Sequence, residues 1–128
     1  MTRVGFEYAL LRVVPRIERG ELVNVGVIVY AQSGPSLTVA THVDPARLLA
    51  LDPALDVDAV RSALAAVEAV CAGGPEGGAA AALPEGQRFR WLVAPRSTVV
   101  QPGPVHTGMT GDLEAETQRL LARLVLQP

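Results

Sequence analysis

Residues 6–30 read FEYALLRVVPRIERGELVNVGVIVY and set the topology of the chain. Two β-branched and aliphatic runs, 6–14 and 23–30, flank a polar segment that contains Gly20. Two such runs joined by a short polar connection are typical of an antiparallel hairpin. Alternate positions of a strand point to opposite faces of a sheet. We therefore predict a β-hairpin whose second strand carries on one face the valines at positions 23, 25, 27 and 29.

The next part of the chain predicts one strand and two helices. A turn at 32–35 precedes a strand over 37–42. Asp44 and Pro45 are typical of the start of a short helix, because aspartate caps the free backbone N–H groups and proline fits the first turn. A longer helix is expected over 56–71, where apolar residues recur every three or four positions. Its predicted buried stripe is Val57, Val60, Leu64, Val67 and Cys71.

The last third of the chain is richer in glycine and proline. Residues 73–86 predict a flexible Gly/Ala-rich surface loop. The alternation of Phe89, Trp91 and Val93 with Arg88, Arg90 and Leu92 predicts a strand over 88–94. A further strand is expected over 97–101, and 101–111 reads as irregular. Asp112 caps a final helix that runs to about Leu126, with a buried stripe of leucines at 113, 120, 121 and 124.

Together these elements predict one α+β domain spanning residues 1–128. We expect an antiparallel sheet of about five strands, beginning with the β-hairpin and packed by two longer helices and one short helix. The chain is 49% hydrophobic, so it can bury a core of its own. It shows no long apolar run of the kind found in signal peptides and membrane spans, and we expect a cytoplasmic protein.

Charge and cysteine content narrow the function classes. The net charge of −2 gives no basic footprint for nucleic acid or for a membrane surface. The single cysteine, Cys71, can form no internal disulfide and cannot build a zinc site alone. We expect no metal and no cofactor. All 11 cationic side chains are arginine, which suits phosphate or carboxylate but also follows from codon usage in a GC-rich genome.

A first candidate ligand site lies in the hairpin. If the strands pair symmetrically about Glu18, Arg12 lies opposite Asn24. Gly26 on the same face would leave a notch that a ligand or another backbone could enter. A structural alternative is that Asn24 satisfies a bend, Gly26 receives a helix or the Trp91 ring, and Arg12 pairs with a carboxylate.

A second candidate site follows the predicted strand at 88–94. Arg96, Ser97 and Thr98 form a turn with a guanidinium and two hydroxyls, and His106 and Thr107 follow in a loop. This set of donors could hold an anion, and Arg12 and Arg96 could share one pocket. The structural alternative is that the hydroxyls cap turns and His106 packs within its loop. There is neither a phosphate-loop motif nor a Gly-x-Ser-x-Gly elbow.

Two pairs of segments resemble a known bacterial family. EYALLRVVP at 7–15 and RGELVNVGV at 19–27 resemble the opening of the family called "domain of unknown function 3037". PRSTVVQP at 95–102 and PVHTG at 104–108, preceded by RFRW at 88–91, are similar to its second block. The resemblance implies a place beside kinase-like proteins of the HipA type, and hence a protein partner.

These observations favour a small accessory or binding module that acts on a protein partner, with an anion as a further ligand and a homo-oligomer through a sheet edge as one assembly. The alternative is an enzyme of phosphate or nucleotide chemistry that uses Arg12, Arg96, Ser97 and His106.

Overall fold

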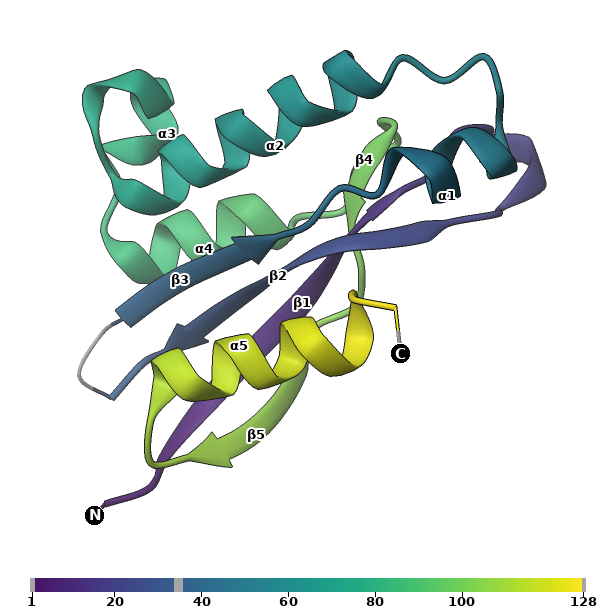
Figure 1. Ribbon diagram of the computed structural model, residues 1–128. Helices are drawn as coiled ribbons and strands as arrows, with labels where there is room; N and C mark the ends of the chain where they lie inside the picture. The colour runs from purple at the N-terminus through teal and green to yellow at the C-terminus, as the bar shows by residue number, and fades with distance from the viewer. Residues whose placement is uncertain (1, 34–35, 128) are drawn as a thin grey trace.

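The strand β1 (Val4–Val13) is the centre of an antiparallel sheet of five strands in the computed structural model, which describes residues 2–33 and 36–127 (Figure 1). It forms a hairpin with β2 (Val23–Ala31), and β2 pairs in turn with β3 (Ser36–Thr41). The predicted hairpin and the α+β class are confirmed. The predicted turn spans 32–35, and positions 34 and 35 lie outside the described residues.

The other side of β1 is shared by two short strands. β4 (Val100–Pro102) pairs with the second half of β1, and β5 (His106–Thr110) pairs with its first half. The sheet therefore has β3 at one edge and the successive strands β4 and β5 at the other. Pairing of two copies through such an edge stays a prediction.

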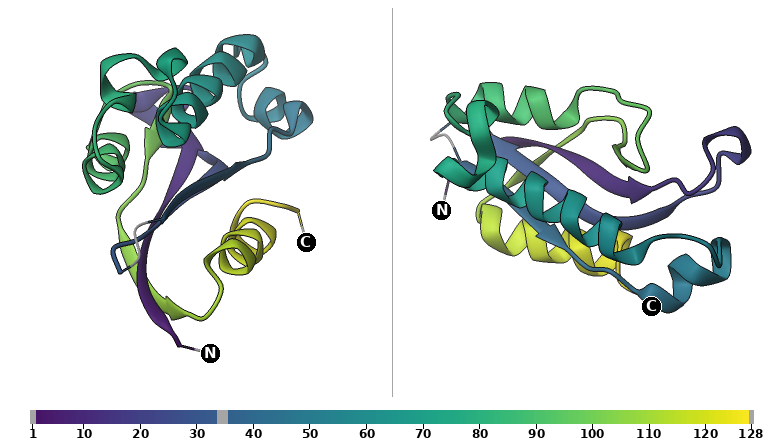
Figure 2. Two further views of the ribbon diagram at one scale, coloured as in Figure 1. Left: turned by 90° about the vertical axis from the view of Figure 1, so that its left-hand side faces the viewer. Right: turned by 90° about the horizontal axis from the view of Figure 1, so that it is seen from above.

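Helices cover both faces of this sheet. Four of them lie on one face and α5 lies on the other, so the described chain forms three layers (Figures 1 and 2). The helices are α1 (Pro45–Leu51), α2 (Val57–Ala72), α3 (Gly78–Ala81), α4 (Glu85–Val93) and α5 (Leu113–Leu124). Single 3-10 turns stand at Ile17–Arg19 and at Pro75–Gly77.

Each face of the sheet has its own hydrophobic core. The larger core joins Leu11 and Ile28 of the sheet to residues of α1, α2 and α4 such as Leu48, Leu64 and Phe89. The smaller core joins residues of β1 and β2 to Leu120 of α5. Because both faces of β2 are buried, its run of valines and isoleucine is nearly continuous rather than alternating with polar residues.

Three aspartates begin the three helices that the sequence predicts. The carboxylates of Asp44, Asp56 and Asp112 accept hydrogen bonds from backbone N–H groups in the first turns of α1, α2 and α5. These bonds satisfy donors that have no partner within the helix. The stripe predicted for α2 is confirmed in part, since Val60, Leu64 and Cys71 are buried, whereas Val57 and Val67 are half-buried and Val70 is buried as well. In α5 the buried residues are Leu120 and Thr117, and Leu124 is exposed.

The strand predicted over 88–94 is wrong, because these residues belong to the helix α4. The two buried side chains, Phe89 and Leu92, are three positions apart and lie on the same face of a helix. Trp91 lies on the other side and is 43% exposed. A segment of seven residues that alternates in polarity is compatible with two turns of a helix as well as with a strand. The packing of Phe89 against Tyr30 favours the helix over the strand.

The boundaries of the neighbouring segments also differ from the prediction. The expected loop 73–86 contains a 3-10 turn and the short helix α3. The strand expected over 97–101 begins only at Val100, and the region expected to be irregular contains β5. β5 supplies the fifth strand of the sheet in place of 88–94. The glycine in β5 and the prolines before it are typical of irregular structure, so composition did not predict this strand. Gly108 is needed in the strand because it lies over the ring of Phe6, where a side chain would clash.

A shift of register in the hairpin changes which residues share a face. Leu11 pairs with Gly26 and Arg12 pairs with Asn24, which leaves Val25 as an extra residue of β2. Such a bulge reverses the alternation along the strand. The valines at 23 and 25 face the larger core, and those at 27 and 29 face the smaller core. The prediction that all four share one face is therefore wrong.

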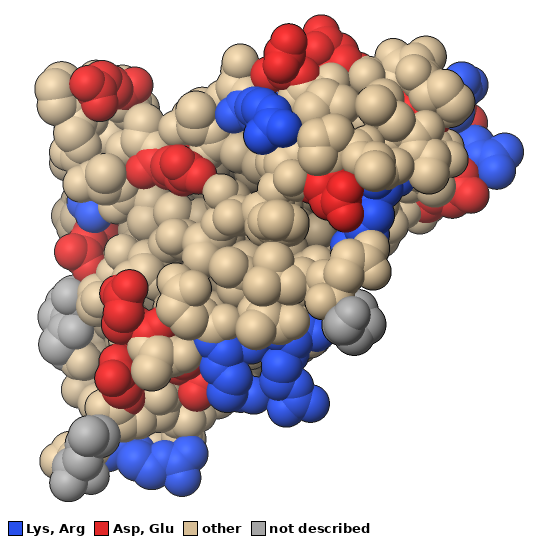
Figure 3. Space-filling model, viewed as in Figure 1, with Lys and Arg blue, Asp and Glu red and all other residues tan. Residues whose placement is uncertain are grey.

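Acidic and basic side chains are mixed over the side of the molecule seen in Figure 3, where both α2 and α5 are in view. Figure 3 shows acidic groups beside basic ones there, with a group of basic side chains below α5. In the part of the chain that is described, no helix is long and apolar enough to cross a membrane.

Candidate functional site

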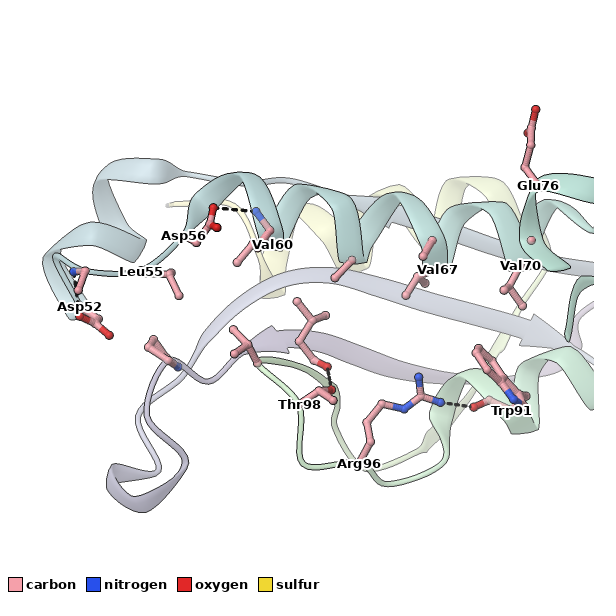
Figure 4. Close-up of a pocket in the computed structure, with 18 residues that line it drawn as sticks. Asp52, Leu55, Asp56, Val60, Val67, Val70, Glu76, Trp91, Arg96 and Thr98 are labelled. Atoms are coloured by element: carbon pink, nitrogen blue, oxygen red, sulfur yellow. Dashed lines mark hydrogen bonds between the residues drawn. The ribbon is translucent and has the colours of Figure 1, made fainter. Parts of the chain in front are cut away.

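An apolar cleft of about 590 Å³ opens between α2 and the edge of the sheet at β4. Successive turns of α2 each contribute an alanine or a valine side chain to the cleft. In Figure 4, Val60, Val67 and Val70 point from α2 toward the strands, and Arg96 and Thr98 approach from the opposite side. The other apolar lining residues include Leu55, Ala59, Ala63, Ala66, Val99 and Val100. This size and lining are typical of a binding site.

Trp91 and Arg96 form one wall of the cleft. The Arg96 guanidinium lies over the indole ring of Trp91, 4.8 Å from its centroid, and its Nη2 donates to Trp91 O at 2.7 Å. Its Nε also donates to Ala94 O at 3.4 Å. These contacts fix the planar guanidinium and hold the exposed indole in place. Arg96 is thus a positioned cation rather than a freely rotating surface side chain.

Acidic side chains lie at the ends of the cleft. Asp52 and Asp56 line it near the start of α2, and Glu76 lies near the other end of the helix (Figure 4). Asp52 is buried, pairs with Arg16 at 3.7 Å and accepts a hydrogen bond from Ala54 N. The cleft therefore joins an apolar floor to one acidic end, at Asp52 and Asp56, whereas the Glu76 side chain points away from the strands (Figure 4).

A second hollow, of about 470 Å³, lies next to the cleft and shares Arg96 with it. Arg12 lines this hollow as well, so the structure brings together the two arginines that the sequence placed in one pocket. The other lining residues are Val93, Pro95, Gln101, Pro102, Gly103, Pro104 and Val105. None of the lining residues is acidic.

Arg12 lies on β1 between two paired strands, opposite Asn24 on one side and Gln101 on the other. Its side chain packs at Gly103, where an added methyl group would lie 3.4 Å from Arg12 Cζ. Its Nε is buried and has no hydrogen-bond partner among the described residues. Within the described chain no carboxylate lies within 4 Å of Arg12 or Arg96, so the predicted pairing with an acidic residue is not seen.

Asn24 and Gly26 do not share a face. The Asn24 Nδ2 donates to Leu124 O at 3.1 Å and so ties β2 to the end of α5. Gly26 faces the opposite core, where an added Cβ would lie 2.9 Å from Ala40 O and 3.2 Å from Leu11 Cδ1. The expected notch is filled by the backbone of β3 and by Leu11. The prediction of a common face is wrong because of the bulge at Val25.

Of the remaining predicted site residues, Thr98 lines the cleft together with Arg96, whereas Ser97, His106 and Thr107 line neither the cleft nor the arginine hollow. The Thr98 Oγ1 donates to Val100 O at 2.7 Å and lines the cleft, while Ser97 lines neither hollow. His106 is on β5, with its ring 5.2 Å from that of Tyr8. Thr107 lies next to it, opposite Glu7, and lines another hollow with Phe6 and Met109. Arg12 and Arg96 thus line one hollow, and Arg96 and Thr98 line the cleft. His106 lines neither of them.

The apolar cleft itself was missed by the sequence argument. Its signal was the small residues Ala59, Ala63 and Ala66, which recur every three or four positions along the apolar side of α2. These small side chains are exposed or half-buried and leave open space between α2 and the sheet. Trp91 could not be placed in the cleft while its segment was expected to be a strand.

Cys71 has the environment of a structural residue rather than of a reactive one. Burial raises the pKa of the Cys71 thiol to about 11, which outweighs the opposite effect of the Arg88 charge. Such a thiol is a poor nucleophile at neutral pH. Among residues 2–33 and 36–127 there is no group of three or more His, Cys, Asp or Glu side chains placed to hold a metal ion.

The fold and the site define an α+β domain with an open apolar cleft and an adjoining hollow lined by arginine. The family described as "Protein of unknown function (DUF3037)" matches residues 8–125, and the chain belongs to this family. The resemblance read from the sequence is therefore confirmed. No curated protein and no solved structure matches the chain.

Proposed function

We propose that this chain is a cytoplasmic binding module that docks an apolar segment of a protein partner in the cleft between α2 and β4. The observation that carries the proposal is the cleft itself, with Trp91 43% exposed and Val99 41% exposed on its wall. Large apolar groups exposed together in a concave surface mark interaction sites. Tryptophan beside arginine is a pair that often dominates the energy of binding.

The dimensions and charges of the cleft favour a peptide segment as the ligand. From Ala59 to Val70 the lining of α2 extends for about 16 Å, at 1.5 Å per residue, which accommodates about five residues of extended chain. Asp52 and Asp56 add negative charge at the end near the start of α2. The complementary partner segment is apolar and has lysine or arginine at one end, which would also speed association.

The enzyme alternative is less well supported by the geometry. It requires Arg12, Arg96, Ser97 and His106 to act on one substrate. Arg12 and Arg96 line one hollow, whereas Ser97 and His106 do not line it. A general base has to lie within hydrogen-bond reach of its substrate, directly or through one water. We therefore propose binding rather than catalysis.

The partner that we propose is a HipA-like kinase, the protein class implied by the family resemblance. The test is titration calorimetry of the purified chain with such a kinase from the same genome. We expect Ala66→Arg, which places a long cation at the cleft, to weaken binding by at least about tenfold, or 1.4 kcal/mol. The neighbouring Ala65→Arg is the matched control, because Ala65 is exposed on α2 but does not line the cleft.

Equal binding by the two arginine variants would contradict the cleft as the docking site. No binding by the wild-type chain would contradict the kinase as the partner. Circular dichroism melts of both variants give the matched fold check, since alanine and arginine have similar helix propensities.

A further inference from the structure

We infer that the hollow between Arg12 and Arg96 is a binding site for a phosphate monoester. This inference does not rest on the docking function, since it concerns a different set of residues that shares Arg96 alone with the apolar cleft described above.

The first step is the state of Arg12. A part-buried guanidinium whose Nε is withdrawn from water and unpaired is unfavourable, because a buried charged donor loses its hydration. The common remedy is a carboxylate, as Glu7 provides for Arg90 at 2.8 Å. No acidic residue of the described chain does this for Arg12. Because Nε itself is shielded from solvent, an anion from outside the chain would bind the other N–H groups of Arg12, which lines the hollow.

The second step is the orientation of Arg96. Its Nε and Nη2 are held by Ala94 O and Trp91 O, which leaves Nη1 without a partner among the described residues. The ring of Trp91 fixes the plane of the guanidinium. A donor that is already oriented loses little conformational entropy when a ligand binds.

The third step is the lining of the hollow. Three of its residues are prolines, Pro95, Pro102 and Pro104, which have no backbone N–H to offer. The charged donors are therefore the two guanidinium groups, and the Gln101 amide adds a neutral one. The Arg12 head group packs beside Gly103, where an added Cβ would lie in ordinary van der Waals contact, 3.4 Å from Cζ.

The charge of the site selects the class of ligand. Two guanidinium groups bring a charge of +2 into a hollow with no acidic lining residue. A carboxylate would neutralise half of this charge, whereas a phosphate monoester near pH 7 carries about −1.5 to −2 and offers three acceptor oxygens. Arginine forms two parallel hydrogen bonds with such a group. A phosphate monoester is therefore the better match.

The experiment is titration calorimetry of the full chain with inorganic phosphate, phenyl phosphate and acetate at fixed ionic strength. We expect both phosphates to bind and acetate to bind at least about tenfold more weakly. Stronger binding of phenyl phosphate than of inorganic phosphate would assign the site to an esterified phosphate, and the reverse would assign it to the free ion. Binding should weaken as the pH falls below about 6, where the phosphate ester becomes a monoanion.

Three variants separate this site from the docking cleft. Arg12→Lys keeps the positive charge but removes the planar pair of N–H donors. We expect this variant to bind phenyl phosphate about tenfold more weakly and to bind the kinase as the wild type does. Arg61→Lys is the matched control, since Arg61 is exposed on α2 and lines neither the cleft nor this hollow. Ala66→Arg should leave phenyl phosphate binding unchanged.

Failure of the wild-type chain to bind either phosphate would overturn the inference, as would equal losses in the Arg12 and Arg61 variants. Neither result would bear on the docking proposal, which is judged by the Ala66 variant and the kinase. A loss of phenyl phosphate binding in Arg12→Lys with an unchanged melting temperature supports the site and excludes a merely structural role for the guanidinium.

Discussion

At Gly26 two strands approach so closely that a side chain has no room. An added Cβ would lie 2.9 Å from the backbone oxygen of Ala40 and 3.1 Å from Thr41 Cγ2. The backbone oxygen belongs to a paired strand and cannot move without disturbing its ladder. Glycine is therefore required here by packing between β2 and β3, rather than by a ligand.

We predict that Gly26→Ala lowers the free energy of unfolding by about 1–3 kcal/mol, the usual cost of overpacking a core. Gly5→Ala on β1 is the control, because the new methyl group would lie at an ordinary 3.8 Å from Met109 Sδ. Urea denaturation measures both. If the two variants unfold at the same urea concentration, the close approach of β3 to Gly26 is not as described.

A second prediction concerns Cys71. Burial raises the pKa of its thiol from 9.0 to about 11, and the charges of Glu85 and Glu68 add to this effect while that of Arg88 opposes it. Each pKa unit changes the thiolate fraction tenfold. At pH 8 we expect a maleimide to label the native thiol at least about 100-fold more slowly than the thiol unfolded in urea.

The same shift sets a dependence of stability on pH. Between pH 9 and about 11 the unfolded thiol loses its proton while the native thiol retains it, so the unfolded state binds fewer protons and stability falls as the pH rises. Below pH 9 both states are protonated and Cys71 contributes no such dependence. Rapid native labelling at pH 8 would place the thiol on an exposed face of α2 instead.

At the scale of single elements, the helices with a capping aspartate could be predicted from the sequence, whereas α3 and α4, which have no side-chain cap, could not. Asp44, Asp56 and Asp112 mark their helices because side-chain capping is a local interaction between neighbours in the chain. The helix α4 has no side-chain cap at Pro84. Its state depends on the stacking of Phe89 on Tyr30, 59 positions earlier in the sequence, with centroids 5.2 Å apart.

The candidate site divides in the same way. An arginine in an otherwise apolar strand is unusual by itself, so Arg12 could be singled out, and the pairing of Arg12 with Asn24 followed from the hairpin. The cleft could not be predicted, because it forms between α2 and β4, with 28 positions from the end of the helix to the start of the strand, and includes Trp91 of α4. The bulge at Val25 also has no signal beyond the glycine that follows it.

One hydrogen bond joins the edge strand β3 to the helix α5. The hydroxyls of Thr38 and Thr117 are 2.9 Å apart, and Thr117 Oγ1 also donates to Leu113 O at 2.7 Å. Thr117 is 2% exposed, so its hydroxyl has little access to water. This pair is the polar contact that holds α5 against β3.

We predict that Thr117→Val lowers the free energy of unfolding by about 1 kcal/mol, because the Thr38 hydroxyl then loses its partner in a part-buried place. Thr38→Val should cost less, since Thr117 keeps its bond to Leu113 O. The double variant should be less destabilised than the sum of the single ones, because no hydroxyl is left unpaired. Strict additivity in urea denaturation would show that the two hydroxyls do not interact.

At the scale of the whole molecule, the two faces of the sheet are unequally covered. Of the described residues, 13 are buried in the core between the sheet and helices α1, α2 and α4, whereas five are buried in the core under α5. Hydrophobic stabilisation scales with the apolar area that is removed from water. Helix α5 is therefore held by much less apolar burial than α2, although both are amphipathic and capped by aspartate.

This asymmetry predicts that α5 opens before the rest of the protein unfolds. Elements with few buried contacts open with free energies below that of global unfolding. In native-state hydrogen exchange we expect the backbone N–H groups of α5 to exchange at least about 1.4 kcal/mol more easily than those of β1 and β2, a tenfold difference in protection. Thr117→Val should widen this gap by a further ~1 kcal/mol, since it weakens the contact between α5 and β3.

The docking cleft and the arginine-lined hollow provide an internal control for this experiment. The cleft is built on α2 and the arginine hollow on β1 and β4, and no residue of α5 lines either of them. Opening of α5 should therefore leave both intact, and phenyl phosphate should raise protection in β1 and β4 by RT ln(1 + [L]/Kd), about 2.7 kcal/mol at 100 times Kd, without changing protection in α5. Equal protection of α5 and β1 in the free protein would mean that the two layers unfold together, and the smaller core would then be as strong as the larger one.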